Sequence, residues 1–216
     1  MFRAQLHADG FHSVKYVRLD VTDVTTIQAA KETIDLAEGK LDVLVNNAGT
    51  CFRQSDFFIA SWFESSAIGK LEENQNATSV SLATIRDAME TNFFGLVQTT
   101  IAFLPLLRKS TNGVIMNVAT VSNTVQARPN SGFHVVAYNT SKAAVNSYTI
   151  ALAQELKREG IKVNAVAPGF VSTKLNNFSR GGKSAKAGAE VLLPWALLEK
   201  DGPTCMFKSW HWYLIW

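Results

Sequence analysis

Short apolar runs alternate with longer amphipathic stretches along this chain, and this rhythm restricts the fold more than any other feature of the sequence. The runs have the length of buried strands, and apolar residues recur three or four positions apart between them, as they do in helices. The strand candidates are residues 14–19, 41–45, 114–118 and 162–166, and the helix candidates are residues 27–37, 81–108 and 137–158. This alternation predicts βαβ units and an α/β fold with a parallel sheet that is covered on both faces.

Composition narrows the class of protein. No repeat, low-complexity tract or linker interrupts the 216 residues, which predicts a single domain, residues 1–216. The net charge is +3, but Lys and Arg are scattered, so we expect no nucleic-acid partner. No apolar run reaches the ~20 residues of a membrane span, and the start lacks a signal sequence, so we expect no membrane partner. Two isolated cysteines are typical of a reducing compartment. We expect a cytoplasmic protein without a metal site.

The candidate site residues follow the apolar runs. Ligands of parallel α/β sheets bind beyond the carboxyl ends of the strands, so the residues that end each strand are the first candidates. The segments at these positions are Asn46-Asn47-Ala48-Gly49, Asn117-Val118-Ala119-Thr120 and Pro168-Gly169, and Asn92 lies in the helix between the first two.

Tyr138 and Lys142 are four positions apart on a predicted helix and therefore share one face of it. A lysine ammonium near a phenol favours the phenolate and lowers the tyrosine pKa from its usual ~10. Tyr138 would then be a usable acid or base near neutral pH. The spacing alone is common by chance, and its alternative interpretation is a tyrosine at the edge of the core beside a solvated lysine.

Taken in order, these motifs resemble the short-chain dehydrogenase/reductase family. The matching segments are LDVLVNNAG, TNFFG, GVIMNVAT, YNTSKAAV and VNAVAPGFVST, and the resemblance runs from about residue 14 to the C-terminus. It implies a Rossmann-like doubly wound parallel sheet. It also implies an NAD(P)-dependent oxidoreductase that interconverts a carbonyl and a secondary alcohol of a small molecule. Relatives pair through the two long helices, so a homo-oligomer is expected.

The resemblance assigns catalytic roles residue by residue. Tyr138 would protonate the carbonyl oxygen of the substrate, or take the proton of the alcohol in the reverse direction. Lys142 would lower the pKa of Tyr138 and bind the nicotinamide ribose, and Asn92 would hold a water that links the lysine to solvent. The family has a serine that orients the substrate oxygen. Here Thr120 aligns best with it, and Ser122 is the alternative.

The resemblance also assigns cofactor contacts. Asp20 would meet the adenine, and Asn47, Ala48 and Gly49 would pass the adenosine ribose. The residues expected beside the nicotinamide are Pro168, Gly169 and Thr173. The analogy with carbonyl-reducing relatives favours NADP, and NAD stays possible.

One family motif has no counterpart in the chain. Dinucleotides bind through a glycine-rich turn, written TGxxxGxG in this family, but no two glycines here are two positions apart. The chain therefore resembles a truncated member that lacks the first strand, helix and second strand. In the family those two strands separate the strands at 14–19 and 41–45, which predicts a gap of ~14 Å, three spacings of ~4.8 Å, and an open sheet edge. We expect poor folding alone or weak cofactor binding, unless a partner or a repacked N-terminus fills the gap.

Two hypotheses about function follow. The retained set Asn92, Tyr138 and Lys142 favours an enzyme. The missing glycine turn favours a non-catalytic truncated paralogue, or a fragment that acts through association. The aromatic end, residues 210–216, could close a pocket, form an oligomer contact or be a tail.

Overall fold

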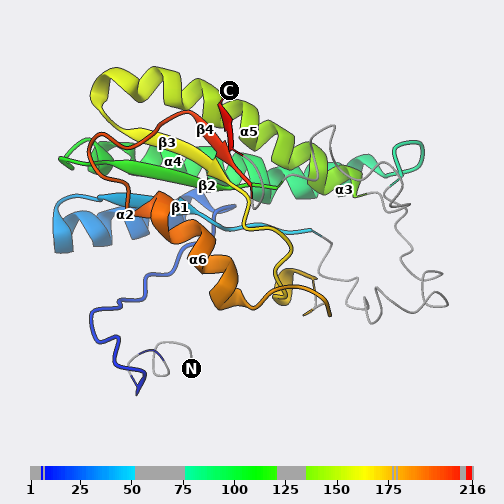
Figure 1. The fold of residues 1–216 in the computed structure, drawn as a ribbon, viewed down its shortest axis with the longest axis horizontal. Helices are drawn as coiled ribbons and strands as arrows, with labels where there is room; N and C mark the ends of the chain where they lie inside the picture. Colours follow the sequence, from blue (N-terminus) through cyan, green and yellow to red (C-terminus); the bar gives the residue numbers. More distant parts are fainter. Residues whose placement is uncertain are drawn as a thin grey trace.

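A five-stranded sheet forms the centre of the protein, with the strands in the order β1-β2-β3-β4-β5 (Figure 1). The computed structural model describes residues 6, 8–51, 76–120, 135–176, 178, 180–209 and 213–215. The strands are β1 (Val43–Asn46), β2 (Val114–Val118), β3 (Lys162–Val166), β4 (Met206–Lys208) and β5 (Tyr213–Ile215). The first four are parallel and β5 is antiparallel to β4. The predicted α/β fold with a parallel sheet is confirmed.

Helices cover both faces of this sheet (Figure 1). They are α2 (Val24–Glu38), α3 (Leu82–Met89), the π-helix η2 (Glu90–Phe94), α4 (Gly95–Leu107), α5 (Val136–Leu156), the 3-10 helices η3 (Lys157–Glu159) and η4 (Lys174–Asn176), and α6 (Ala185–Ala196). No helix among the described residues has the length and apolar character needed to cross a membrane.

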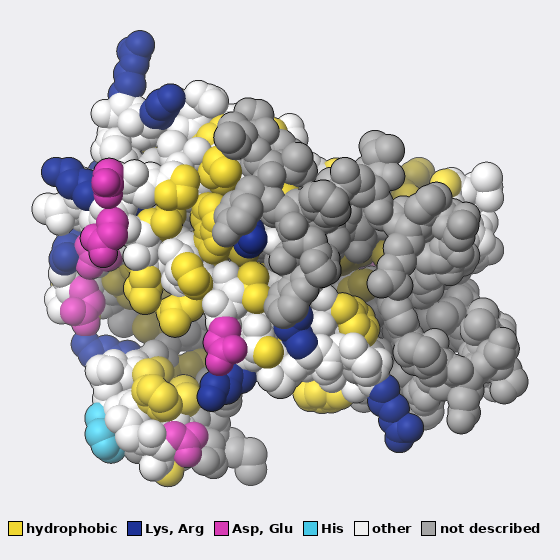
Figure 2. Space-filling view, viewed as in Figure 1, with side chains coloured by type: hydrophobic (Ala, Val, Ile, Leu, Met, Phe, Trp, Pro, Cys, Tyr) yellow, Lys and Arg dark blue, Asp and Glu magenta, His cyan; other side chains and the backbone are white. Residues whose placement is uncertain are grey.

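Alternation along the strands builds one core on each face. Ile115 and Val163 are fully buried and pack with residues of α4 and α5, such as Leu156. Met116 and Val166 point to the other face, where they pack against Trp195 of α6. Successive side chains of a strand point to opposite faces, so near-continuous apolar runs such as β2 are expected where both faces are covered. Figure 2 shows hydrophobic side chains gathered where α6 crosses the sheet.

Local signals set the two ends of α2, which extends beyond the predicted range 27–37 at both ends. The Asp23 carboxylate accepts from the backbone N–H of Thr25 and caps α2. Gly39 ends α2 with φ 70°, a left-handed conformation that glycine adopts without a steric penalty. The long helix predicted over 81–108 is three consecutive elements, because a π-helical turn separates α3 from α4. Pro105 lies inside α4 near its end and does not interrupt it.

The strand predicted at residues 14–19 is wrong. No residue of this segment is assigned to a strand, and most of it is exposed. A strand needs a neighbour for its backbone hydrogen bonds, and the described sheet begins at β1, which pairs only with β2. Val45 on β1 is 41% exposed. Within the described residues, β1 therefore has one side without a strand neighbour.

The segment after residue 20 is held against α4. A Cβ on Gly95 would lie 2.8 Å from Cγ2 and 2.9 Å from the carbonyl oxygen of Val21, so only glycine permits this approach. The side-chain amide of Gln98 donates to the same carbonyl. This contact fixes the chain beside Asp20 near the start of α4.

The aromatic C-terminal end contributes an edge strand. β5 pairs antiparallel with β4, with Phe207 opposite Leu214. Residues 213–215 therefore take part in the sheet, a role that was not among the three possibilities named from the sequence.

Candidate active site

Asn92 lies at the centre of a hydrogen-bond network at the carboxyl-end edge of the sheet. Its side chain is fully buried. Its Oδ1 accepts from the backbone N–H of Thr50 at 2.7 Å, and its Nδ2 donates to the Thr50 carbonyl at 2.8 Å. Nδ2 also donates to Ser141 Oγ at 2.9 Å. The Ser141 hydroxyl donates to the Tyr138 carbonyl at 2.7 Å. Asn92 therefore links the loop after β1 to the first turns of α5.

The helix that carries Asn92 has an unusual local form. Asn92 is the middle residue of η2, whose π-helical register ends when the N–H of Gly95 bonds to the carbonyl of Glu90. Short π-helical turns within α-helices occur frequently at functional sites. The turn could not be predicted from the apolar spacing, which continues through it.

The side chains of Asn92 and Lys142 both lie beside Gly49. A Cβ on Gly49 would lie 3.3 Å from Asn92 Oδ1 and 3.8 Å from Lys142 Nζ. Lys142 is 4% exposed, and its Nζ donates to the Val118 carbonyl at the end of β2, at 2.8 Å. Three of the segments singled out in the sequence thus meet here. The close approach of both polar side chains explains why glycine suits position 49.

Tyr138 hydrogen-bonds with the side chain of Thr120, which stands at the end of β2. Burial of the phenol raises the pKa of Tyr138 above its usual value, the nearby Cys51 thiol adds to the rise, and the Thr120 hydrogen bond opposes it. The sequence predicted that Lys142 lowers this pKa. The shift in this structure is in the opposite direction, because desolvation penalises the phenolate and the ammonium of Lys142 is directed at Val118.

Burial also shifts the pKa values of Lys142 and Cys51. It lowers the pKa of the Lys142 ammonium to about 8, because the charged form loses hydration. It raises the pKa of the Cys51 thiol to about 12 for the same reason, since here the thiolate is the charged form. Cys51 was not predicted to lie near the site, because nothing in its spacing points to Tyr138.

The lowered pKa of Lys142 gives a testable pH dependence. An unfolded lysine keeps its proton up to about pH 10.5, whereas the folded one loses it near pH 8. Between these values the unfolded state binds more protons, so the free energy of unfolding rises with pH. Relative to Lys142→Met, the wild type should gain up to about 1.4 kcal/mol per pH unit from about pH 8 upward. Urea unfolding across this range measures the difference, and parallel profiles for the two proteins would contradict the assignment.

Two further asparagines form a buried network through the sheet. Asn46 Nδ2 donates to Thr100 Oγ1 of α4 at 2.9 Å and to Asn117 Oδ1 at 2.8 Å. Asn117 Nδ2 donates to Thr149 Oγ1 of α5 at 2.8 Å. The network joins two strands to the two helices that cover them. The sequence placed both asparagines at strand ends but gave neither a role, since their hydrogen bonds depend on the packing of the helices.

The other predicted residues that the structure describes lie on loops. Asn47, Ala48 and Gly49 are exposed on the loop after β1. Asp20 is exposed, and hydrogen bonds from Thr22 lower its pKa. The residues after β3 are Pro168, Gly169, with φ 83°, and Thr173, whose N–H donates to Asn176 Oδ1. Ser122, the alternative to Thr120, lies outside the described residues.

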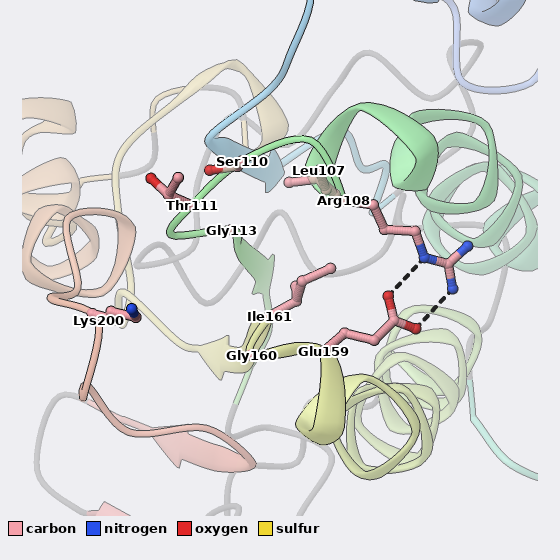
Figure 3. Close-up of a pocket in the computed structure, with 9 residues that line it drawn as sticks. All are labelled: Leu107, Arg108, Ser110, Thr111, Gly113, Glu159, Gly160, Ile161 and Lys200. Carbon is pink, nitrogen blue, oxygen red and sulfur yellow. Dashed lines mark hydrogen bonds and ion pairs between the residues drawn. The ribbon is translucent and has the colours of Figure 1, made fainter.

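A cavity of about 380 Å³ lies at the other end of the sheet, where β2 and β3 begin. The guanidinium of Arg108 and the carboxylate of Glu159 face each other on one wall at 2.7 and 2.9 Å, with Lys200 across from them (Figure 3). None of the predicted site residues lines this cavity. The chemistry suggested by the sequence is therefore located at the opposite edge.

Known proteins resemble this chain in sequence. The sequence profile described as short chain dehydrogenase matches residues 2–183. The chain belongs to the short-chain dehydrogenase family. It is 34% identical over 166 residues to 3-ketodihydrosphingosine reductase of Bacteroides thetaiotaomicron, covering 77% of this chain and 52% of the relative. It is 28% identical to salutaridine reductase of Papaver bracteatum, covering 94% of this chain and 80% of the relative.

Solved structures of short-chain dehydrogenases show the same fold. Salutaridine reductase of Papaver somniferum superposes with a TM-score of 0.74 at 26% identity, over 95% of this chain and 85% of the other. NADPH-bound carbonyl reductase from chicken fatty liver gives a TM-score of 0.76 at 22% identity, over all of this chain and 82% of the other. The second identity is low enough that this likeness concerns the fold alone. The chain spans about half the length of the first curated relative, 52%.

Proposed function

We propose that the chain carries the catalytic centre of an NAD(P)-dependent oxidoreductase that interconverts a carbonyl and a secondary alcohol. The observation that carries this proposal is the convergence of Gly49, Asn92 and Lys142 beside the α5 turn that bears Tyr138. Its relatives include two proteins named as reductases, 3-ketodihydrosphingosine reductase and salutaridine reductase. Family membership supports the reaction class, and the geometry supports the choice of residues.

Tyr138 is the proton donor of the proposed reaction. The phenol is protonated at neutral pH, as the donor in reduction must be, although its raised pKa makes it a weaker acid than an exposed tyrosine. The Thr120 hydroxyl, which already hydrogen-bonds with Tyr138, orients the substrate oxygen toward the phenol. Lys142 supplies a buried cation close to Gly49 that favours negative charge developing in the site. Ser122 stays the alternative to Thr120.

The chain fits a nicotinamide cofactor in part. Gly49 leaves open the space that a Cβ would fill beside Lys142, as close approach of a ligand to the backbone requires. Gly49 and its neighbours Asn47 and Ala48 would bind the adenosine ribose, Asp20 the adenine, and Pro168, Gly169 and Thr173 the nicotinamide. When bound, the cofactor supplies or accepts the hydride. No glycine-rich turn for its pyrophosphate occurs in the sequence, so we expect weak binding.

Transfer of deuterium tests the reaction class directly. With NADPH or NADH deuterated at the nicotinamide C4 position and held at millimolar concentration, a panel of ketones should give alcohols labelled at the carbinol carbon. The same panel with Tyr138→Phe is the control for background transfer. If no labelled alcohol forms after prolonged incubation of the ketones with a folded protein, that result would count against the proposal. The preferred cofactor should be NADP, with NAD as the alternative.

A second candidate function is association without catalysis. The observations in its favour are the unpaired side of β1 within the described sheet and the failure of residues 14–19 to form a strand. A truncated paralogue or fragment would use this edge to bind a partner. The enzyme is preferred, because association needs none of Asn92, Tyr138 and Lys142.

The 216 residues would act as one domain of a cytoplasmic homo-oligomer that pairs through α4 and α5.

A further inference from the structure

Ser141 has both hydrogen-bonding capacities of its hydroxyl committed inside the candidate site. The residue is fully buried. Its hydroxyl proton is donated to the Tyr138 carbonyl at 2.7 Å, and its oxygen accepts from Asn92 Nδ2 at 2.9 Å. The serine therefore joins the backbone of the proposed acid to the side chain of Asn92. The sequence analysis assigned no role to it.

The direction of these bonds fixes the orientation of the Asn92 amide. Because the Ser141 proton is directed at Tyr138, its oxygen faces Asn92 as an acceptor and selects the NH₂ group. The amide oxygen is then left for the backbone N–H of Thr50. A flipped amide would place oxygen against oxygen at Ser141 and N–H against N–H at Thr50. The Thr50 carbonyl, which accepts from the same NH₂ group, selects this orientation as well, so Ser141 and Thr50 together exclude the flipped form of Asn92.

We propose that Ser141 is a positioning residue, which sets Asn92 and the first turn of α5 so that the Tyr138 phenol is held at the reacting carbonyl. This inference rests on the proposed function, because it assumes that Tyr138 is the acid. Ser141 itself lies behind the site and acts through the two residues that it joins. Its loss should lower turnover while substrate binding changes little, because the Tyr138 hydroxyl itself stays in the protein.

Three variants separate positioning from packing. Ser141→Ala removes the hydroxyl and should lower kcat about fivefold to tenfold, the effect of one buried hydrogen bond, with KM within about twofold. Ser141→Cys keeps the size of the side chain but bonds weakly, so it should resemble Ser141→Ala. Thr99→Val is the matched control, because the buried Thr99 hydroxyl on α4 has no hydrogen-bond partner among the described residues. A Ser141→Cys enzyme with wild-type kcat would show that only volume matters and would overturn the proposal.

Hydrogen exchange of the backbone amides at the start of α5 gives a readout that needs no turnover. The Asn139 N–H bonds to the Val135 carbonyl at 2.8 Å, so its exchange reports on the first turn of the helix. Loss of the Ser141 hydroxyl should loosen this turn and speed the exchange in Ser141→Ala, whereas Thr99→Val should leave it unchanged. Unchanged exchange in Ser141→Ala contradicts the positioning role, even if the wild type reduces no ketone. Failure of the proposed function alone would instead appear as no turnover with the exchange raised as expected.

Discussion

Tyr138→Phe is expected to lower kcat by about 10²- to 10⁴-fold, the contribution of a positioned general acid. Phenylalanine keeps the ring and removes only the hydroxyl that hydrogen-bonds with Thr120. The effect should therefore appear in turnover, while the unfolding midpoint changes little. Steady-state rates at saturating cofactor and the urea midpoint of the same preparations measure both quantities.

Tyr148→Phe is the matched control. Tyr148 lies on the same helix, α5, and its ring meets the ring of Phe93 edge-on, with the centroids 6.2 Å apart. Phenylalanine preserves this contact, so turnover should stay near that of the wild type. Turnover that survives Tyr138→Phe, or that falls equally in both variants, would contradict the role of Tyr138.

Asn117→Leu should give the largest loss of stability, about 3 kcal/mol in the free energy of unfolding. Asn117 is fully buried and both sides of its amide are used, one by Asn46 and the other by Thr149. Leucine has a similar volume but leaves polar groups on β1 and α5 without this partner. Urea unfolding followed by circular dichroism measures the change.

Asn47→Leu provides the comparison, because Asn47 is exposed on the loop after β1. An exposed substitution away from a network usually changes stability by about 0.5 kcal/mol or less. Similar destabilisation by the two variants would mean that the buried network contributes no more than an ordinary surface position.

The sequence predicted those parts of the fold that depend on local pattern. Apolar spacing located α2 and α5. The strand predicted at residues 14–19 failed because a strand is stable only beside a neighbour, which the pattern of one segment does not reveal. The π-helical turn at Asn92 was not predicted, because the apolar spacing continues through it.

The candidate site shows the same division. The order of the motifs predicted that Gly49, Asn92 and Lys142 lie at one edge of the sheet, and the structure places them side by side there. The pKa of Tyr138 could not be predicted from its spacing to Lys142, because burial sets its direction. Ser141 was overlooked because one of its two hydrogen bonds joins it to Asn92, which is 49 positions away in the sequence.

Thermal unfolding of the chain with graded NADPH and NADH tests the central claim most directly. Only binding to the native state raises the midpoint, by an amount set by the ratio of free ligand to its dissociation constant. A catalytic centre without a pyrophosphate-binding turn predicts a cooperative transition that rises with NADPH only near millimolar concentration. A transition that is indifferent to both dinucleotides at every concentration would contradict the enzyme and leave association as the function of this chain.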